Sequence, residues 1–162
     1  MKSFSTILVL TLLVLNTACS RKTEQAPLPD FKQLVLEQYI EPFKNAEIDR
    51  WMQVFADDAV GMHNTLPPFV GKEAINGFGN MVAENLKIEQ MDIVIDNVRV
   101  KGDWALTRGS FTSKMIPKDM TDSSAIPSNK GKFILLWERQ EDEQWKVILD
   151  MGNSNEGPPP PA

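Results

Sequence analysis

The spacing of apolar residues changes once along this chain of 162 residues, and that change limits the folds open to it. Before Asn85, apolar residues recur every three or four positions, which is typical of amphipathic helices. After Asn85 the spacing becomes two and β-branched residues are frequent, as in strands that bury one face. Helices followed by strands favour an α+β fold over an alternating βαβ arrangement.

Three helices are expected in the first half of the chain. They are predicted after Asp30, over residues 48–55 and after Gly71. Asp30 and Asn45 are the side chains available to cap the first two helices. Pro42 lacks a backbone donor, so the first helix should kink or end near Glu41.

The expected strands form one short segment and a four-stranded antiparallel meander. They are predicted over residues 59–64, 88–100, 104–115, 132–140 and 145–153. The Asp57–Asp58 pair, just before the first of them, is interpreted as a feature of a helix end and turn. The polar stretch 117–131 predicts a long hairpin connection, which is either a lid or a mobile surface loop.

The first nineteen residues have the features of an export signal. Lys2 precedes a run over residues 7–15 in which only Thr11 is polar, and the small residue Ala18 comes before Cys19. The apolar run is too short to cross a bilayer as a stable helix. This segment is therefore excluded from the fold.

The same segment resembles a bacterial lipoprotein signal, in which the cysteine is acylated and becomes the first residue of the mature protein. The resemblance implies a signal over residues 1–18. Composition and patterning divide the rest of the chain into a polar tether over 19–29, a folded domain over 30–154 and a Pro-rich tail over 155–162. Ser20 after the lipidated Cys19 implies a location in the cell envelope, at the outer membrane facing the periplasm. The alternative is a plain secretory signal that leaves an unused thiol.

Composition excludes several classes of function. A net charge of -5 gives no electrostatic footprint for a phosphate backbone, so nucleic acid is not an expected partner. With 1 Cys and 1 His, the chain has neither an internal disulfide framework nor the usual zinc sites. No Gly-rich phosphate loop is present, and neither a metal nor a cofactor is expected.

Five separated segments of the chain together carry a family resemblance: residues 39–59, 70–75, 104–109, 137–139 and 145–150. In order and spacing they resemble the nuclear transport factor 2-like superfamily, in its ketosteroid-isomerase and SnoaL-like branch. The resemblance covers the chain from Asp30 to Ser154. It implies a cone-shaped, strongly bent antiparallel sheet wrapped around three N-terminal helices, with an apolar pocket open at one end.

Residue by residue, the resemblance to the isomerases implies an incomplete copy of their site. Tyr39 corresponds to the tyrosine that donates a hydrogen bond to the substrate oxyanion. His63 occupies the position of their catalytic aspartate, and an imidazole can also act as a base near neutral pH. Their third residue, a protonated aspartate, falls near Phe133 or Leu135, and neither side chain can donate a hydrogen bond.

Asp150 completes the candidate catalytic set, and six aromatic residues are candidates for the pocket wall. If Asp150 faces inward, it can orient His63 or bind a polar group of a ligand; if it faces outward, it is a solvated carboxylate. His63 and Tyr39 also have purely structural interpretations, as hydrogen-bonded residues of a strand end and a core. The candidate pocket residues are Phe43, Trp51, Phe55, Phe111, Phe133 and Trp137.

Three functions follow as expectations. The first is a lipid-anchored envelope protein whose cone binds a small, largely apolar molecule. The second is a proton-transfer enzyme, an isomerase, dehydratase or cyclase, with His63 as base and Tyr39 as oxyanion donor. The third, which the resemblance implies, is an interaction module that forms a homodimer through the sheet.

Overall fold

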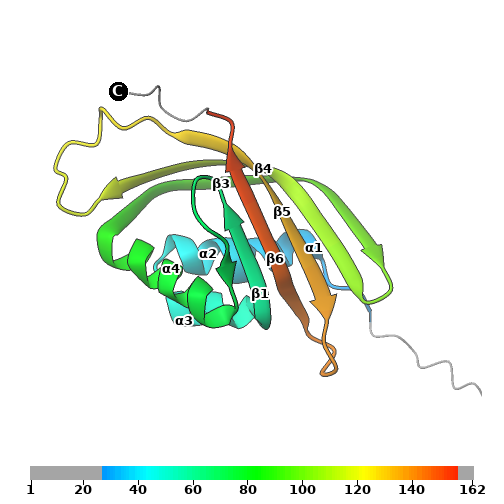
Figure 1. Ribbon diagram of the computed structural model, residues 1–162. Coiled ribbons are helices and arrows are strands. Elements are labelled where there is room, and N and C mark those ends of the chain that lie inside the picture. Colours follow the sequence, from blue (N-terminus) through cyan, green and yellow to red (C-terminus); the bar gives the residue numbers. More distant parts are fainter. Residues whose placement is uncertain (1–26, 157–162) are drawn as a thin grey trace, which may run out of the picture.

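The computed structural model describes residues 27–156, in which a curled six-stranded sheet packs against short helices on its concave face (Figure 1). The predicted α+β fold is confirmed. The helical elements are α1 (Phe31–Leu34), the π-helical segment η1 (Val35–Ile40), α2 (Glu41–Lys44), α3 (Ile48–Trp51), the 3-10 segment η2 (Met52–Val54) and α4 (Lys72–Asn85). The strands are β1 (Phe55–His63), β2 (Phe69–Val70), β3 (Leu86–Lys101), β4 (Trp104–Pro117), β5 (Asn129–Arg139) and β6 (Trp145–Ser154).

The sheet has the strand order β2-β1-β6-β5-β4-β3 and is not closed. Strands β3 to β6 form the predicted antiparallel meander. The other pairings are antiparallel as expected, and only β1 and β6 pair in parallel. Parallel pairing is possible because β1 and β6 are not joined by a hairpin: β2, α4 and strands β3 to β5 lie between them.

The first helical region does not end at Glu41 but continues through Pro42 to Lys44. Asp30 caps its start, because its carboxylate accepts a hydrogen bond of 2.9 Å from the backbone N–H of Lys32. The intervening turns are π-helical, and Pro42 then lies in the first turn of α2. A proline is tolerated there because a first-turn N–H has no partner within its own helix.

The second helix is shorter than predicted. It ends as a 3-10 turn at Val54, and Phe55 already begins β1, four positions before the predicted strand at Ala59. Asp57 and Asp58 therefore lie in a strand and not in a turn, within a stretch where the register between β1 and β6 shifts. Asn45 does not cap this helix; Glu47 is its N-cap residue and makes no side-chain cap.

The third predicted helix is confirmed as α4, directly after Gly71. Gly71 has a φ of 85°, a left-handed backbone conformation that glycine adopts without strain. It is the N-cap residue of α4, and the two-residue β2 precedes it. This small strand pairs with β1. The sequence analysis predicted no strand after Pro67 and Pro68.

The core fills the space between the helices and the concave face of the sheet. Phe31 packs edge-on against Trp145 with ring centroids 5.0 Å apart. Trp137 is fully buried, and its indole N–H donates a hydrogen bond of 3.1 Å to the equally buried Thr107 hydroxyl. A buried indole therefore has its donor satisfied, which fixes the ring in one orientation.

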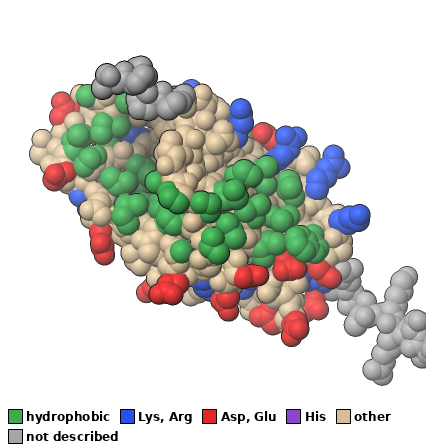
Figure 2. Space-filling view, viewed as in Figure 1, with side chains coloured by type: hydrophobic (Ala, Val, Ile, Leu, Met, Phe, Trp, Pro, Cys, Tyr) green, Lys and Arg blue, Asp and Glu red, His purple; other side chains and the backbone are tan. Residues whose placement is uncertain are grey.

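The outer face of the sheet carries a band of apolar side chains that crosses the strands (Figure 2). Its exposed members include Met62 on β1, Val70 on β2 and Met151 on β6. A homodimer through this face stays a prediction. Between residues 27 and 156, the structure contains no helix with the length and apolar character needed to cross a membrane.

Candidate functional site

A cavity of about 490 Å³ lies between the helices and the concave face of the sheet. Its lining is mainly apolar, and residues Ile126 and Pro127 of the β4–β5 loop complete the wall. Four of the six aromatic candidates line it: Phe43, Trp51, Phe111 and Phe133. The other two, Phe55 and Trp137, lie in the core and not on the cavity wall, being 1% and 0% exposed.

The three candidate catalytic residues meet at one end of this wall. The Tyr39 hydroxyl donates a hydrogen bond of 2.6 Å to Oδ2 of Asp150, across a sequence separation of 111 residues. The same Oδ2 lies 3.6 Å from Nε2 of His63. A buried carboxylate thus stands between a phenol and an imidazole, which is an arrangement able to orient the imidazole.

A bulge in the last hairpin makes Asp150 face inward. Trp137 pairs with Val147, but the preceding residue of β5, Leu136, pairs with Leu149, so β6 carries one extra residue there. Val147 and Asp150 are consequently both buried although they are three positions apart, where a regular strand would alternate. The bulge therefore resolves the two orientations that the sequence left open.

The environment of Asp150 raises the pKa of its carboxyl group. Burial raises the pKa of its carboxyl above the ordinary value, and the neighbouring His63 and the Tyr39 hydrogen bond offset only part of that rise. Burial also raises the pKa of Tyr39 well above its ordinary value, and the charge of Asp150 adds to this. Tyr39 therefore stays a neutral donor, and its proton is directed to Asp150.

This pKa shift predicts a dependence of stability on pH. An aspartate in the unfolded chain has a pKa of about 3.9, so between that pH and the higher pKa of folded Asp150 the folded state binds more protons. The free energy of unfolding that this group contributes should therefore fall as the pH rises through that window. Asp150→Asn removes the effect, so the variant should gain stability relative to the unmodified protein as the pH rises above about 4. Urea unfolding of both proteins measures this, and parallel pH profiles would contradict it.

The imidazole of His63 lines the cavity and is held in place by packing against Phe78. It stacks on Phe78 of α4 with ring centroids 5.2 Å apart and planes inclined by 22°. Its side chain keeps 24% exposure, so a ligand can touch it. Below the ring lies Gly152, where an added Cβ would sit 3.5 Å from Nδ1. An alanine at position 152 would therefore be in ordinary contact with the imidazole.

Two further glycines on the concave face have an aromatic ring of the neighbouring strand above them. Gly109 pairs with Phe133, and Gly131 pairs with Phe111. A Cβ at Gly109 would lie 2.8 Å from Cε1 of Phe133, and a Cβ at Gly131 would overlap the ring of Phe111. Covering a glycine with an aromatic ring is a known way to stabilise a curved sheet, and here the covering rings also form cavity wall.

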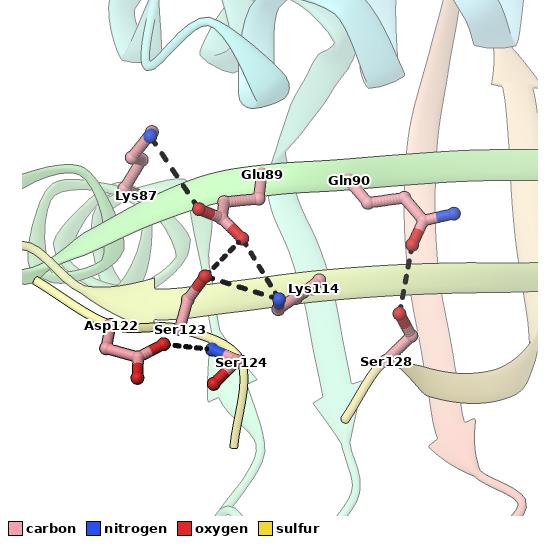
Figure 3. A network of polar contacts seen from close by, with 8 residues as sticks. All are labelled: Lys87, Glu89, Gln90, Lys114, Asp122, Ser123, Ser124 and Ser128. Atoms are coloured by element: carbon pink, nitrogen blue, oxygen red, sulfur yellow. Dashed lines mark hydrogen bonds and ion pairs between the residues drawn. The ribbon is translucent and has the colours of Figure 1, made fainter. Parts of the chain in front are cut away.

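The loop between β4 and β5 is tied to the sheet by polar contacts (Figure 3). The Ser123 hydroxyl donates a hydrogen bond of 3.0 Å to Glu89, which also lies 3.2 Å from the ammonium of Lys114. Ser128 donates a hydrogen bond of 3.0 Å to the side-chain oxygen of Gln90. These contacts hold the loop along β3 and β4, and its role as a lid stays a prediction.

Several wall residues were missed by the sequence analysis. They are Phe78 of α4, Met91 and Ile93 of β3, and Ser113 and Met115 of β4. The alternation in β3 and β4 shows which residues share a face, and this was the available signal. Among the described residues, no cluster of three His, Cys, Asp or Glu side chains is arranged to hold a metal ion.

Solved structures with the same fold are numerous. A ketosteroid isomerase-like protein from Erwinia carotovora atroseptica has 19% identity and a TM-score of 0.66, covering 77% of this chain and 94% of its own. An NTF2-like protein from Cytophaga hutchinsonii has 13% identity and a TM-score of 0.62, covering 78% and 99%. A protein named as a candidate dehydratase of the NTF2-like family, from Streptomyces avermitilis, has 14% identity and a TM-score of 0.58, covering 78% and 94%. At these identities the likeness shows the fold alone.

The comparison with curated proteins found no match. The model of the SnoaL-like domain, however, matches residues 36–147, which include η1 except Val35, all of β1 to β5 and the beginning of β6. The chain therefore belongs to the SnoaL-like domain family, and it has the fold of the NTF2-like structures.

Proposed function

We propose that the domain binds a small, largely apolar molecule in the cavity and moves a proton on it, in a reaction of the isomerase or dehydratase type. One observation carries this proposal: His63 lines an apolar cavity with Nε2 3.6 Å from the buried carboxylate of Asp150. A base oriented by a carboxylate is a recurrent arrangement in proton transfer. The candidate dehydratase from Streptomyces avermitilis, which shares the fold, agrees with this class of reaction.

In the proposed reaction His63 first acts as the base. Its neutral imidazole takes a proton from a carbon next to a carbonyl group of the substrate, and the C–H electron pair moves into an enolate. The imidazolium then returns the proton to a different carbon, which is an isomerisation, or to a departing hydroxyl group, which leaves as water. Asp150 stabilises the imidazolium between the two steps.

Deuterium exchange tests the proposal without knowledge of the natural substrate. Steroid enones, tetralones and β-hydroxy ketones would first be screened for a rise in the Tm of the protein, because a ligand of the folded state must stabilise it. Those that bind would then be incubated in deuterated water and followed by proton NMR. We expect faster loss of the signal next to the carbonyl with protein than with buffer alone. Binding without exchange would contradict proton transfer.

Binding without chemistry is the second candidate, and the position of the Tyr39 proton favours it. The hydroxyl donates to Asp150 and not into the cavity, so the oxyanion donor that the resemblance implied is engaged elsewhere. The loss of one such donor typically costs an enzyme about 2.7 to 4 kcal/mol of transition-state stabilisation. In the exchange experiment, a rise in Tm without deuterium incorporation is the result that supports this candidate.

We also propose that the protein is attached to the cell envelope through a lipid on Cys19, which lies outside the described residues. The proposal rests on the sequence of residues 1–20. Cys19→Ser should move the protein from the membrane fraction to the soluble fraction and abolish incorporation of labelled fatty acid. Cell fractionation and intact-mass measurement would show this. An unmodified protein that lacks an acyl mass and is already soluble would contradict the proposal.

A further inference from the structure

The charged groups of the cavity wall are of one kind. Among the lining residues within 27–156, Asp150 is the only carboxylate, and neither lysine nor arginine is present. His63 also lines the cavity, with Nε2 3.6 Å from the carboxylate of Asp150. Lys114, on the strand that contributes Ser113 and Met115 to the wall, is held by Glu89 outside the lining set. An anionic ligand would therefore find no permanent cation in the wall.

One oxygen of Asp150 is left for a ligand. Oδ2 accepts the Tyr39 hydrogen bond and faces His63, whereas Oδ1 takes no hydrogen bond from the part of the chain that the structure describes. The residue is only 3% exposed, and it lines the cavity. An acceptor in a largely apolar cavity gains from a donor that a bound molecule supplies. A ligand that carries an O–H or N–H group would supply the missing donor.

The charge of the ligand decides how well it satisfies this site. A carboxylate would place a second negative charge in the same low-dielectric wall, without a cation to pair with it. An alcohol brings a donor and no charge. A protonated amine brings both a donor and the opposite charge, and so forms a charge-assisted hydrogen bond.

We propose that the cavity takes apolar molecules whose polar group is an alcohol or a protonated amine and excludes carboxylates of the same size, with Asp150 as the discriminating residue. The inference rests on the proposed function in that both use the same cavity. It concerns the charge of the ligand and not the reaction carried out on it.

Three probes with one aromatic body test the proposal: pyrenylmethanol, pyrenylmethylamine and pyrenecarboxylate. Fluorescence titration of the purified protein at neutral pH gives the Kd of each. We expect the alcohol and the amine to bind at least about tenfold more tightly than the carboxylate, since like charges placed together at a binding site cost several kcal/mol. Asp150→Asn should reduce the ratio of carboxylate Kd to amine Kd at least about tenfold. Asp96→Asn, which removes one exposed carboxylate of β3, is the charge-matched control and should leave the ratio unchanged.

The ratio of carboxylate Kd to amine Kd in the unmodified protein tests the proposal even if Asp150→Asn does not fold. Carboxylate binding as tight as amine binding, or no binding of any of the three, would overturn the proposal. A ratio unaltered by a folded Asp150→Asn variant would overturn the role of Asp150. Deuterium exchange tests the proposed proton transfer independently of these binding measurements. Discrimination without exchange would keep this inference and remove proton transfer, and exchange without discrimination would do the reverse.

Discussion

Gly109→Ala should unfold roughly 10 °C below the unmodified protein, which corresponds to a loss of about 3 kcal/mol, the upper end of what overpacking usually costs. Gly109 lies beside the irregular register of β3, and a Cβ there would overlap the carbonyl oxygen of Val94. Because that atom is backbone, no rotation of a side chain relieves the overlap. The strands must separate, or the sheet must lose its local curvature.

A second glycine gives the matched control for this substitution. Gly77 is exposed on α4, and a Cβ there would meet no atom within 4 Å. Alanine is favoured over glycine in a helix, so Gly77→Ala should raise stability by up to about 1 kcal/mol. Thermal unfolding of both variants measures the contrast. Equal effects at the two positions would show that close packing against Val94 is not what requires glycine at position 109.

Replacing His63 with glutamine should lower the rate of proton transfer by about 10²- to 10⁴-fold, the usual contribution of a positioned acid or base. Glutamine approximates the size of the imidazole and can still hydrogen-bond to Asp150, but it cannot accept a proton near neutral pH. The ligand should therefore bind with nearly unchanged affinity. The rate of deuterium exchange at saturating substrate measures the loss.

Asn153→Ala is the control for the His63 variant. Asn153 also lines the cavity, but its amide does not titrate and instead donates a hydrogen bond to the backbone oxygen of Ser154. Its removal should leave the exchange rate largely unchanged. If both variants reduced exchange to the same extent, the effect of His63 would be one of cavity shape, and its assignment as the base would be lost.

Much of the fold could be predicted from local sequence patterns. The change from helical to alternating spacing at Asn85 marks the end of α4, and the turn at Gly102 separates β3 from β4. These elements depend on residues close together in the chain. The parallel pairing of β1 with β6 joins segments separated by α4 and four strands, and no local pattern predicts such a partner.

The candidate site, too, could be predicted only as far as local sequence determines it. Its residue types and positions could be read from the resemblance, but the inward orientation of Asp150 depends on one extra residue in β6. A shift of one residue moves a side chain from one face of a sheet to the other, and the alternation of apolar residues in this hairpin did not reveal the bulge. Phe55 and Trp137 were misplaced for a related reason: aromatic character does not distinguish a cavity wall from the core behind it.

The π-helical segment that contains Tyr39 has a consequence for how the site tolerates insertions and deletions. A π turn holds one residue more than an α turn, so it offsets the helix before it from the helix after it by about 100°. That offset lets Phe31 pack on Trp145 while Tyr39, in the same helical region, points at Asp150. A chain shortened by a single residue between Val35 and Ile40 would relax into an ordinary helix that can satisfy only one of these two contacts. The length of this segment, and not only its composition, therefore maintains the hydrogen bond between Tyr39 and Asp150.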